Sequence, residues 1–205
     1  MSEELSSEME SRIIDSATKV FTEKGKKGAS MQDIAEEAGI NRTLLNYYFR
    51  SKEKLFDAVF ERVFAGMLPR MATIMNSDDD IFMKFERFFD IYTDLLLANP
   101  LTPMFILHEI NTNPDLMINA VKNKGIDPSI TLKQIQEEMD RGRIKRMDPR
   151  SLLVNLLALI IFPFAGKPLI QGVLFGGDKE AFNKFLKERR DSTRKSFIES
   201  IKTDA

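Results

Sequence analysis

Five polar side chains that can bind DNA are grouped within seven residues of the chain. Arg and Asn each pair with a base edge through two hydrogen bonds, to guanine and adenine respectively, and a Tyr hydroxyl reaches phosphate oxygens. These residues are Arg42, Thr43, Asn46, Tyr47 and Tyr48. The alternative is that the tyrosines are packing residues and that Arg42 is a solvated charge. Each residue taken alone fits either interpretation, whereas the group favours a surface that reads DNA.

Two short helices joined by a glycine turn are predicted to position this group. Apolar residues recur at helical spacing before Gly39, which is suited to end the first helix in a left-handed conformation. Ser30 and Asn41 are suited to cap the first and second helix. The second helix, at about residues 41–48, turns Leu45 and Phe49 inward. Helix, turn and helix at this length form a helix-turn-helix, whose second helix enters the major groove.

The stretch VFTEKGKKGASMQDIAEEAGINRTLLNYYFRSKEKLF, residues 20–56, resembles the tetracycline-repressor (TetR) family of bacterial regulators. The shared pattern is a Phe and a Gly that end the first helix, an IA-x-x-AG helix, an aromatic residue and F-x-x-K-E-x-L. Lys26, Leu44, Asn46 and Tyr48 depart from the family's usual residues. Because Asn46 lies where relatives often read a base, the operator sequence cannot be taken from them.

The resemblance implies an all-α fold in two parts. Residues 1–56 would form a three-helix DNA-binding head, and residues 57–205 a larger helical body that binds an effector and dimerises. Gln32 matches a position that can touch a base edge, and Lys52 lies near a helix start that suits a phosphate. The predicted DNA-binding residues are therefore Ser30, Gln32, Asn41, Arg42, Thr43, Asn46, Tyr47, Tyr48 and Lys52.

Composition limits the other function classes. The net charge is −1, but residues 11–56 hold nine Lys and Arg against six Asp and Glu, a net of +3. With no Cys, one His, no phosphate-binding glycine loop and no metal-ligand spacing, the sequence predicts neither an enzyme nor a cofactor. The polar and acidic run NSDDD at 76–80 is interpreted as caps and dipole partners of the following helix, with a metal site as the alternative. No signal peptide or membrane span is predicted, which favours a soluble, cytoplasmic protein.

The remainder of the chain is predicted to be helical. Residues 1–8 are expected to be a frayed tail, and a helix from Ser51 is expected to end near Leu68, before Pro69. Four helix starts share an Asx-Pro pair, in which the capping side chain precedes a proline suited to the first helical position. These pairs are Asn99-Pro100, Asn113-Pro114, Asp127-Pro128 and Asp148-Pro149, and Asp178 is suited to cap a final helix.

The body carries many Phe and Met side chains, which suit an apolar or aromatic effector. Ordinary core packing is the alternative for each of them, and His108 is either a ligand contact or a surface residue. The predicted effector-binding residues are Met67, Met71, Phe85, Phe89, Tyr92, Met104, Phe105, His108, Met117, Asn155 and Phe162. Glu109 and Gln171 are further polar positions in apolar surroundings.

Residues 149–165 are apolar nearly all round, so this helix must be covered on several sides. In the family the last two long helices pair with their copies in a two-fold dimer, and two heads on a dyad read a palindrome. Burial within one core is the alternative. The predicted dimer contacts are Leu152, Leu153, Leu156, Leu159, Ile160, Phe182, Leu186 and Phe197.

Two functions follow from these predictions. The first is a ligand-responsive regulator, most often a repressor in this family, that binds a palindromic operator as a homodimer and is released by a small effector. The second is a helical protein that binds a small molecule or a partner and whose head no longer reads DNA. Leu44 and Asn46 favour the second. DNA binding that falls steeply with salt would distinguish the two.

Overall fold

The computed structural model describes residues 2–99 and 101–203, without the side chains of residues 2–5. Apart from an isolated bridge between Ile144 and Lys202, these residues contain no β pairing, which confirms the all-α prediction. The chain divides into two compact units, residues 1–66 with 104–114 and residues 67–103 with 115–205. The first unit therefore extends beyond the predicted head, because a later segment of the chain returns to it.

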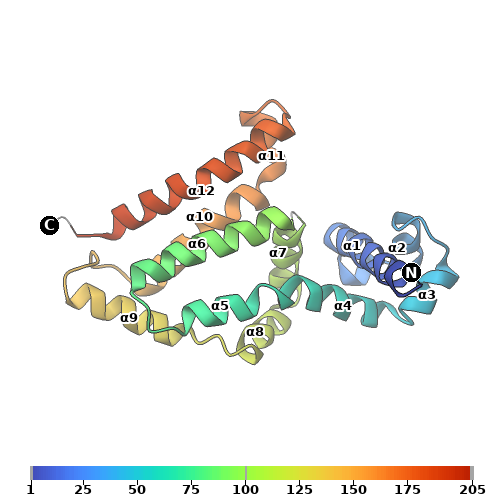
Figure 1. The fold of residues 1–205 in the computed structure, drawn as a ribbon, viewed down its shortest axis with the longest axis horizontal. Coiled ribbons are helices and arrows are strands. Elements are labelled where there is room, and N and C mark those ends of the chain that lie inside the picture. The colour runs from blue at the N-terminus through green and yellow to red at the C-terminus, as the bar shows by residue number, and fades with distance from the viewer. Residues whose placement is uncertain (1, 100, 204–205) are drawn as a thin grey trace. The chain divides into compact units, whose positions relative to one another are not determined.

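The first unit contains the N-terminal helices and most of a later one (Figure 1). Its core consists of apolar side chains from all of these helices, and the ring of Phe21 meets the edge of Phe56 at 5.2 Å between centroids. Phe105 joins them, with its ring 5.9 Å from that of Phe56. The helices are α1 (Ser2–Gly28), α2 (Met31–Glu37), α3 (Arg42–Tyr48), α4 (Lys52–Ala65) and α7 (Thr102–Thr112).

Helix α1 differs from the prediction at both of its ends. It begins at Ser2, so the expected frayed tail is wrong for the described residues. Near its C-terminus the helical path breaks at Gly25, whose φ of 69° and ψ of 164° suit glycine alone. Gly25 thus turns the chain between the long part of α1 and α2.

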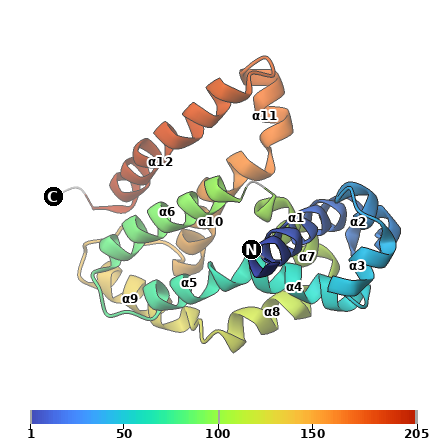
Figure 2. The same cartoon turned by 45° about the vertical axis from the view of Figure 1, so that its right-hand side comes forward.

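The second unit is built around α6, which lies beside α10 and α12 in both views of the fold (Figure 2). Phe85 and Phe89 of α6 pack on Phe197 of α12, with ring centroids 5.6 and 5.5 Å apart. The helices are α5 (Leu68–Met75), α6 (Ile81–Ala98), α8 (Pro114–Asn123), α9 (Pro128–Asp140), α10 (Pro149–Ala165), α11 (Lys167–Leu174) and α12 (Lys179–Ile201).

Most of the predicted caps of these helices are confirmed. Asp80, Asp127, Asp148 and Asp178 each accept a backbone N–H in the first turn of the following helix. Helix α8 begins at Pro114 as expected, whereas Pro100 lies outside the described residues. Helix α4 ends at Ala65, a few residues before the predicted position, and Pro69 stands in the first turn of α5.

Within the described part of the chain, no single helix combines the length and hydropathy needed to cross a bilayer. Only α10 and α11 together pass that test, as a pair bent by 67°.

Candidate nucleic-acid interface

Helix α3 presents a polar face to solvent because its apolar side chains are held in the core. Leu45 is fully buried and Phe49 is nearly so, and these two side chains fix the orientation of the helix. Arg42, Thr43 and Asn46 are exposed on the remaining surface. The inward positions of Leu45 and Phe49 are therefore confirmed, and the predicted base-reading side chains are free to contact a ligand.

The two tyrosines of α3 lie in different environments. Tyr47 is 79% exposed, which is unusual for so large a side chain and argues against the packing alternative. Tyr48 is half-buried, and its ring meets Tyr47 edge to face at 5.4 Å. An aromatic pair of this kind holds the exposed hydroxyl in a defined position.

Ser30 and Asn41 hold the two helices of the motif in place. The Ser30 hydroxyl accepts from the Asp33 N–H at 3.1 Å while the Asp33 carboxylate accepts from the Ser30 N–H at 2.9 Å, a complete capping box. The Asn41 carboxamide oxygen accepts from the Leu44 N–H at 2.8 Å. Gly39 has a φ of 64°, which confirms its left-handed turn. Ser30 and Asn41, which were predicted to contact DNA, thus already use their side chains as helix caps.

Charged hydrogen bonds strengthen the capping box. Lys24 Nζ donates to Asp33 Oδ1 at 2.7 Å. The pKa of Asp33 is lowered to about 2, first by this hydrogen bond and then by those from Ser30. On the same helix, Gln32 is exposed and donates to Glu36 Oε1 at 2.8 Å. Gln32 must give up that contact to reach a base edge.

Lys52, in the first turn of α4, donates hydrogen bonds to backbone carbonyls of the protein. Its Nζ donates to the carbonyl of Ala29 at 2.9 Å and to that of Lys27 at 3.5 Å. These carbonyls belong to the last turn of α1 and to the link between α1 and α2, so Lys52 fixes the segment that leads into the motif. An ammonium has three N–H donors, which leaves one for a phosphate. Arg50, just after α3, is exposed and was absent from the predicted set, although its position beside the motif could have indicated it.

The predicted effector residues do not form one site in either unit. Phe105 is fully buried in the first unit, where Met104 is 42% exposed and His108 is half-buried. Burial of Tyr92 raises the pKa of its hydroxyl to about 12. Of the residues in the second unit, Met67, Phe85, Phe89, Tyr92 and Met117 are buried, Met71 is half-buried, and Asn155 and Phe162 are exposed.

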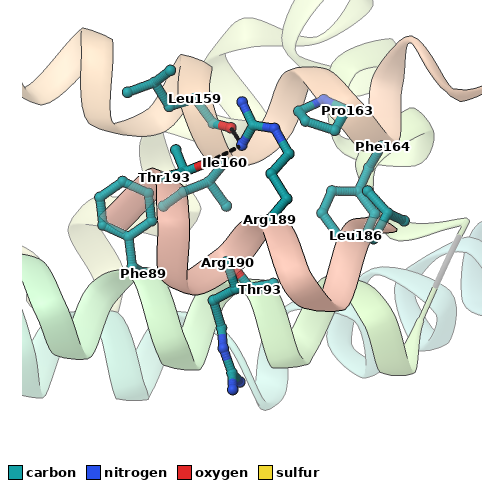
Figure 3. Close-up of a pocket in the computed structure, with 10 residues that line it drawn as sticks. All are labelled: Phe89, Thr93, Leu159, Ile160, Pro163, Phe164, Leu186, Arg189, Arg190 and Thr193. Carbon is teal, nitrogen blue, oxygen red and sulfur yellow. Dashed lines mark hydrogen bonds between the residues drawn. The ribbon is translucent and has the colours of Figure 1, made fainter. Parts of the chain in front are cut away.

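A small cavity lies between α6, α10 and α12 (Figure 3). Its volume of about 20 Å³ has room for roughly one water molecule, so it is too small for an effector. Pro163 has no N–H to offer the Leu159 carbonyl, and Arg189 Nη1 donates to that oxygen at 3.2 Å. Arg189 Nη1 also donates to Thr193 Oγ1 at 2.8 Å, and burial lowers the pKa of its guanidinium.

A larger open groove of about 460 Å³ lies between α10 and α12. Asn155 and Phe162 from the predicted effector set line it, together with Leu152 and Leu159 from the predicted dimer set. Helices α10 and α11 also carry exposed apolar side chains, one of which, Phe162, lines the groove. These are Val154, Phe162, Leu169, Val173 and Leu174, between 62% and 71% exposed.

Most of the predicted dimer contacts lie inside the protomer. A side chain that is buried in its own core has no surface to offer a partner. The buried residues are Leu152, Leu156, Ile160, Phe182, Leu186 and Phe197, while Leu153 and Leu159 are half-buried.

The helix-turn-helix region matches a family described as "Bacterial regulatory proteins, tetR family" over residues 13–59. The chain is 24% identical over 168 residues to the "Probable HTH-type transcriptional regulator YttP" of Bacillus subtilis (strain 168), covering 80% of this chain and 81% of that protein. It is also 24% identical to the "HTH-type transcriptional repressor AcnR" of Corynebacterium diphtheriae, covering 90% of each chain. The solved structure of HlyIIR, a hemolysin II transcriptional regulator, aligns with a TM-score of 0.63 at 18% identity, over 97% of this chain and 99% of that one.

Proposed function

We propose that this chain acts as a transcriptional repressor, as a DNA-binding regulator of the tetR family of bacterial regulatory proteins and not an enzyme. The observation that carries the proposal is the exposed face of α3, where Arg42, Asn46 and Tyr47 stand free while Leu45 anchors the helix. Such a helix can place its side chains against base edges in the major groove. Its site of action is the cytoplasm, where the chromosome lies.

The repressor acts as a homodimer on a palindromic operator. One α3 helix contacts only a few base pairs, and two heads related by a dyad read two half-sites. The exposed apolar side chains of α10 and α11 support dimerisation, since a patch of this kind usually marks an interface. We assign the contact to Val154, Phe162, Leu169, Val173 and Leu174 in place of the buried leucines.

A small apolar or aromatic effector releases the repressor from DNA. It does so by binding better to a conformation that binds DNA poorly, which shifts the population away from the DNA-bound state. The abundance of Phe, with 16 residues, and of Met, with 11, supports an apolar ligand.

The test is selection of binding sites from random duplex DNA by the purified full chain without added ligand. An enriched palindrome with a constant half-site spacing would support three proposals together: the palindromic operator, the homodimer and the DNA-reading role of the helix-turn-helix. Enrichment of a single unpaired half-site would contradict the dimer. If no sequence is enriched and binding does not fall steeply with salt, the alternative of a partner-binding protein with an inactive head replaces the repressor.

A further inference from the structure

Arg189 of α12 is a half-buried guanidinium without a carboxylate partner among the described residues. Its Nη1 donates to the Leu159 carbonyl and to Thr193 Oγ1, and both of these acceptors are neutral. Burial lowers the pKa of the guanidinium, and no nearby negative charge in the described part of the chain acts against that shift. An anion beside Arg189 would therefore stabilise its charged form.

The other arginines of α12 have carboxylate partners. Arg190 Nη1 lies 2.9 Å from Asp94 Oδ1, and Arg194 Nη1 lies 2.7 Å from Asp90 Oδ2. Both pairs join α12 to α6, so these two positive charges are used within the protomer. Among the described residues of this helix, the missing anion is particular to Arg189.

Arg189 also lines the open groove of about 460 Å³ between α10 and α12. Figure 3 shows its side chain reaching from α12 to Leu159 of α10, where Nη1 makes both hydrogen bonds. Its Nε and Nη2 bond no residue that the structure describes, and neither atom is fully enclosed. Two nitrogens of the guanidinium fork are thus accessible to a ligand, and a carboxylate matches that fork.

The rest of the groove is mostly apolar, and its charge lies toward one end. Arg189 and Ile201 both line it and stand just over three turns apart on α12, about 18 Å along the helix. Asn155 adds one neutral amide. A groove of this volume with apolar walls and one charged group suits a small amphiphile. The apolar walls are formed by Leu152, Leu159, Phe162, Phe197 and Ile201.

We propose that this groove binds an amphiphilic carboxylate, a small molecule with one negative group and an apolar tail. The carboxylate pairs with the accessible nitrogens of Arg189, and the tail lies along the apolar walls toward Ile201. The site belongs to the second unit, whereas the reading face of α3 belongs to the first.

Occupancy of the groove opposes dimerisation, a consequence that rests on the proposed homodimer. Val154, Ala158 and Phe162 are spaced four residues apart and form one ridge of α10. Ala158 and Phe162 line the groove, while Val154 and Phe162 belong to the proposed dimer contact. A ligand seated against this ridge covers surface that the second copy needs, so it favours the monomer.

The test uses the full chain and decanoate, with decyltrimethylammonium as a ligand of the same tail and the opposite charge. Affinities are measured by titration calorimetry, below the concentrations at which micelles form, for the wild type, Arg189→Gln and Arg70→Gln. Arg70 is an exposed arginine of α5 in the same unit, and its replacement makes the same change in charge. Circular dichroism verifies that each variant is folded.

Decanoate is expected to bind the wild type and Arg70→Gln equally, and Arg189→Gln about 30-fold more weakly, as for loss of one partner of a desolvated charge pair. Octanoate, shorter by two CH₂ groups, is expected to bind about 15-fold more weakly than decanoate. Decyltrimethylammonium is expected to bind more weakly than decanoate. If Arg189→Gln does not fold, Ala158→Trp at an exposed position is expected to abolish decanoate binding by filling the groove.

Equal decanoate affinity in the wild type and Arg189→Gln, equal binding of the two opposite charges, or no decanoate binding would overturn the site. Loss of the dimer in Arg189→Gln without decanoate binding would also overturn it, because the second copy would then supply the anion.

Sedimentation velocity with the same preparations measures the effect on assembly. Decanoate is expected to convert the wild-type dimer to monomer and to leave the Arg189→Gln dimer unchanged at the same concentration. A wild-type dimer that stays intact under saturating decanoate would overturn the competition. Decanoate binding that depends on Arg189, in a chain that is monomeric without ligand, would keep the site and refute the proposed homodimer.

Discussion

Replacing Gly25 by Ala tests the contact between His108 of α7 and the turn at Gly25 within the first unit. Gly25 has a φ of 69° and a ψ of 164°, a region of conformational space that is essentially restricted to glycine. An added Cβ would also stand 2.7 Å from His108 Nε2 and 3.0 Å from His108 Cε1. The substitution therefore strains the backbone and displaces the imidazole at once.

The two effects can be estimated separately. The backbone term is about 1–3 kcal/mol, and forcing the imidazole away from its preferred rotamer adds about 0.5–1.5 kcal/mol. Their sum, about 1.5–4.5 kcal/mol, corresponds to a Tm that is lower by at least about 3 °C for a chain of this size. Gly39→Ala is the matched control, because Gly39 has a φ of +64° but nothing within 4 Å of its added Cβ.

The assay is thermal unfolding followed by circular dichroism, for Gly25→Ala, Gly39→Ala, His108→Ala and the double variant at residues 25 and 108. Removing the imidazole is expected to recover the steric part of the Gly25→Ala loss and to leave the backbone part. A Gly25→Ala protein as stable as the wild type would refute the close contact. Strictly additive effects of the Gly25 and His108 substitutions would show that the two residues do not press on each other.

The remaining predictions concern DNA reading, assembly and pH. Asn46→Ala is expected to change the base preference at one position per half-site by about 1–3 kcal/mol; an unchanged selected sequence would remove Asn46 from the base-reading residues. Lys52→Ala is expected to weaken binding to all duplexes alike and to reduce the slope of log affinity against log salt by about 1. A lower Tm with an unchanged slope would instead limit Lys52 to holding the segment before α2. Val154→Glu and Phe162→Glu are each expected to dissociate the dimer in sedimentation velocity, because a charge would be buried at the contact, and two intact dimers would place the interface elsewhere. The pKa of Asp33 is lowered from its ordinary 3.8 to about 2, so its stabilising effect is complete above the ordinary value and is lost as pH falls through about 2. The Tm difference between the wild type and Asp33→Asn should accordingly be constant above about pH 4 and shrink below it; a difference that grows on acidification would contradict the assignment.

The helix-turn-helix could be predicted from the sequence because its determinants are local. Ser30 and Asn41 cap helices that begin at the next residue, and Gly39 sets a turn through its own φ. Leu45 and Phe49 lie four residues apart on one helix, so their shared inward face follows from helical geometry. Contacts of this kind need no knowledge of the rest of the fold.

The exposed face of α10 could not be predicted in the same way. A helix that is apolar nearly all round has no polar stripe to mark its outer side, so periodicity alone does not separate Leu152 from Phe162. Packing against α6 and α12 decides which side of α10 faces the core. It buries Leu152 and leaves Phe162 62% exposed. The burial of Leu152 within the protomer, where a dimer contact was predicted, has this physical origin.

The amino-acid sequence by itself determined most of the helix starts and caps, the exposed polar face of α3 and the likeness to a family of regulators. Each of these depends on residues within a few positions of one another. Only the tertiary structure decided that α7 returns to the first unit, that Lys52 bonds the carbonyl of Ala29, and that Glu109 is buried with an unpaired oxygen. These features join residues far apart in the chain, and they exist only once the helices have packed.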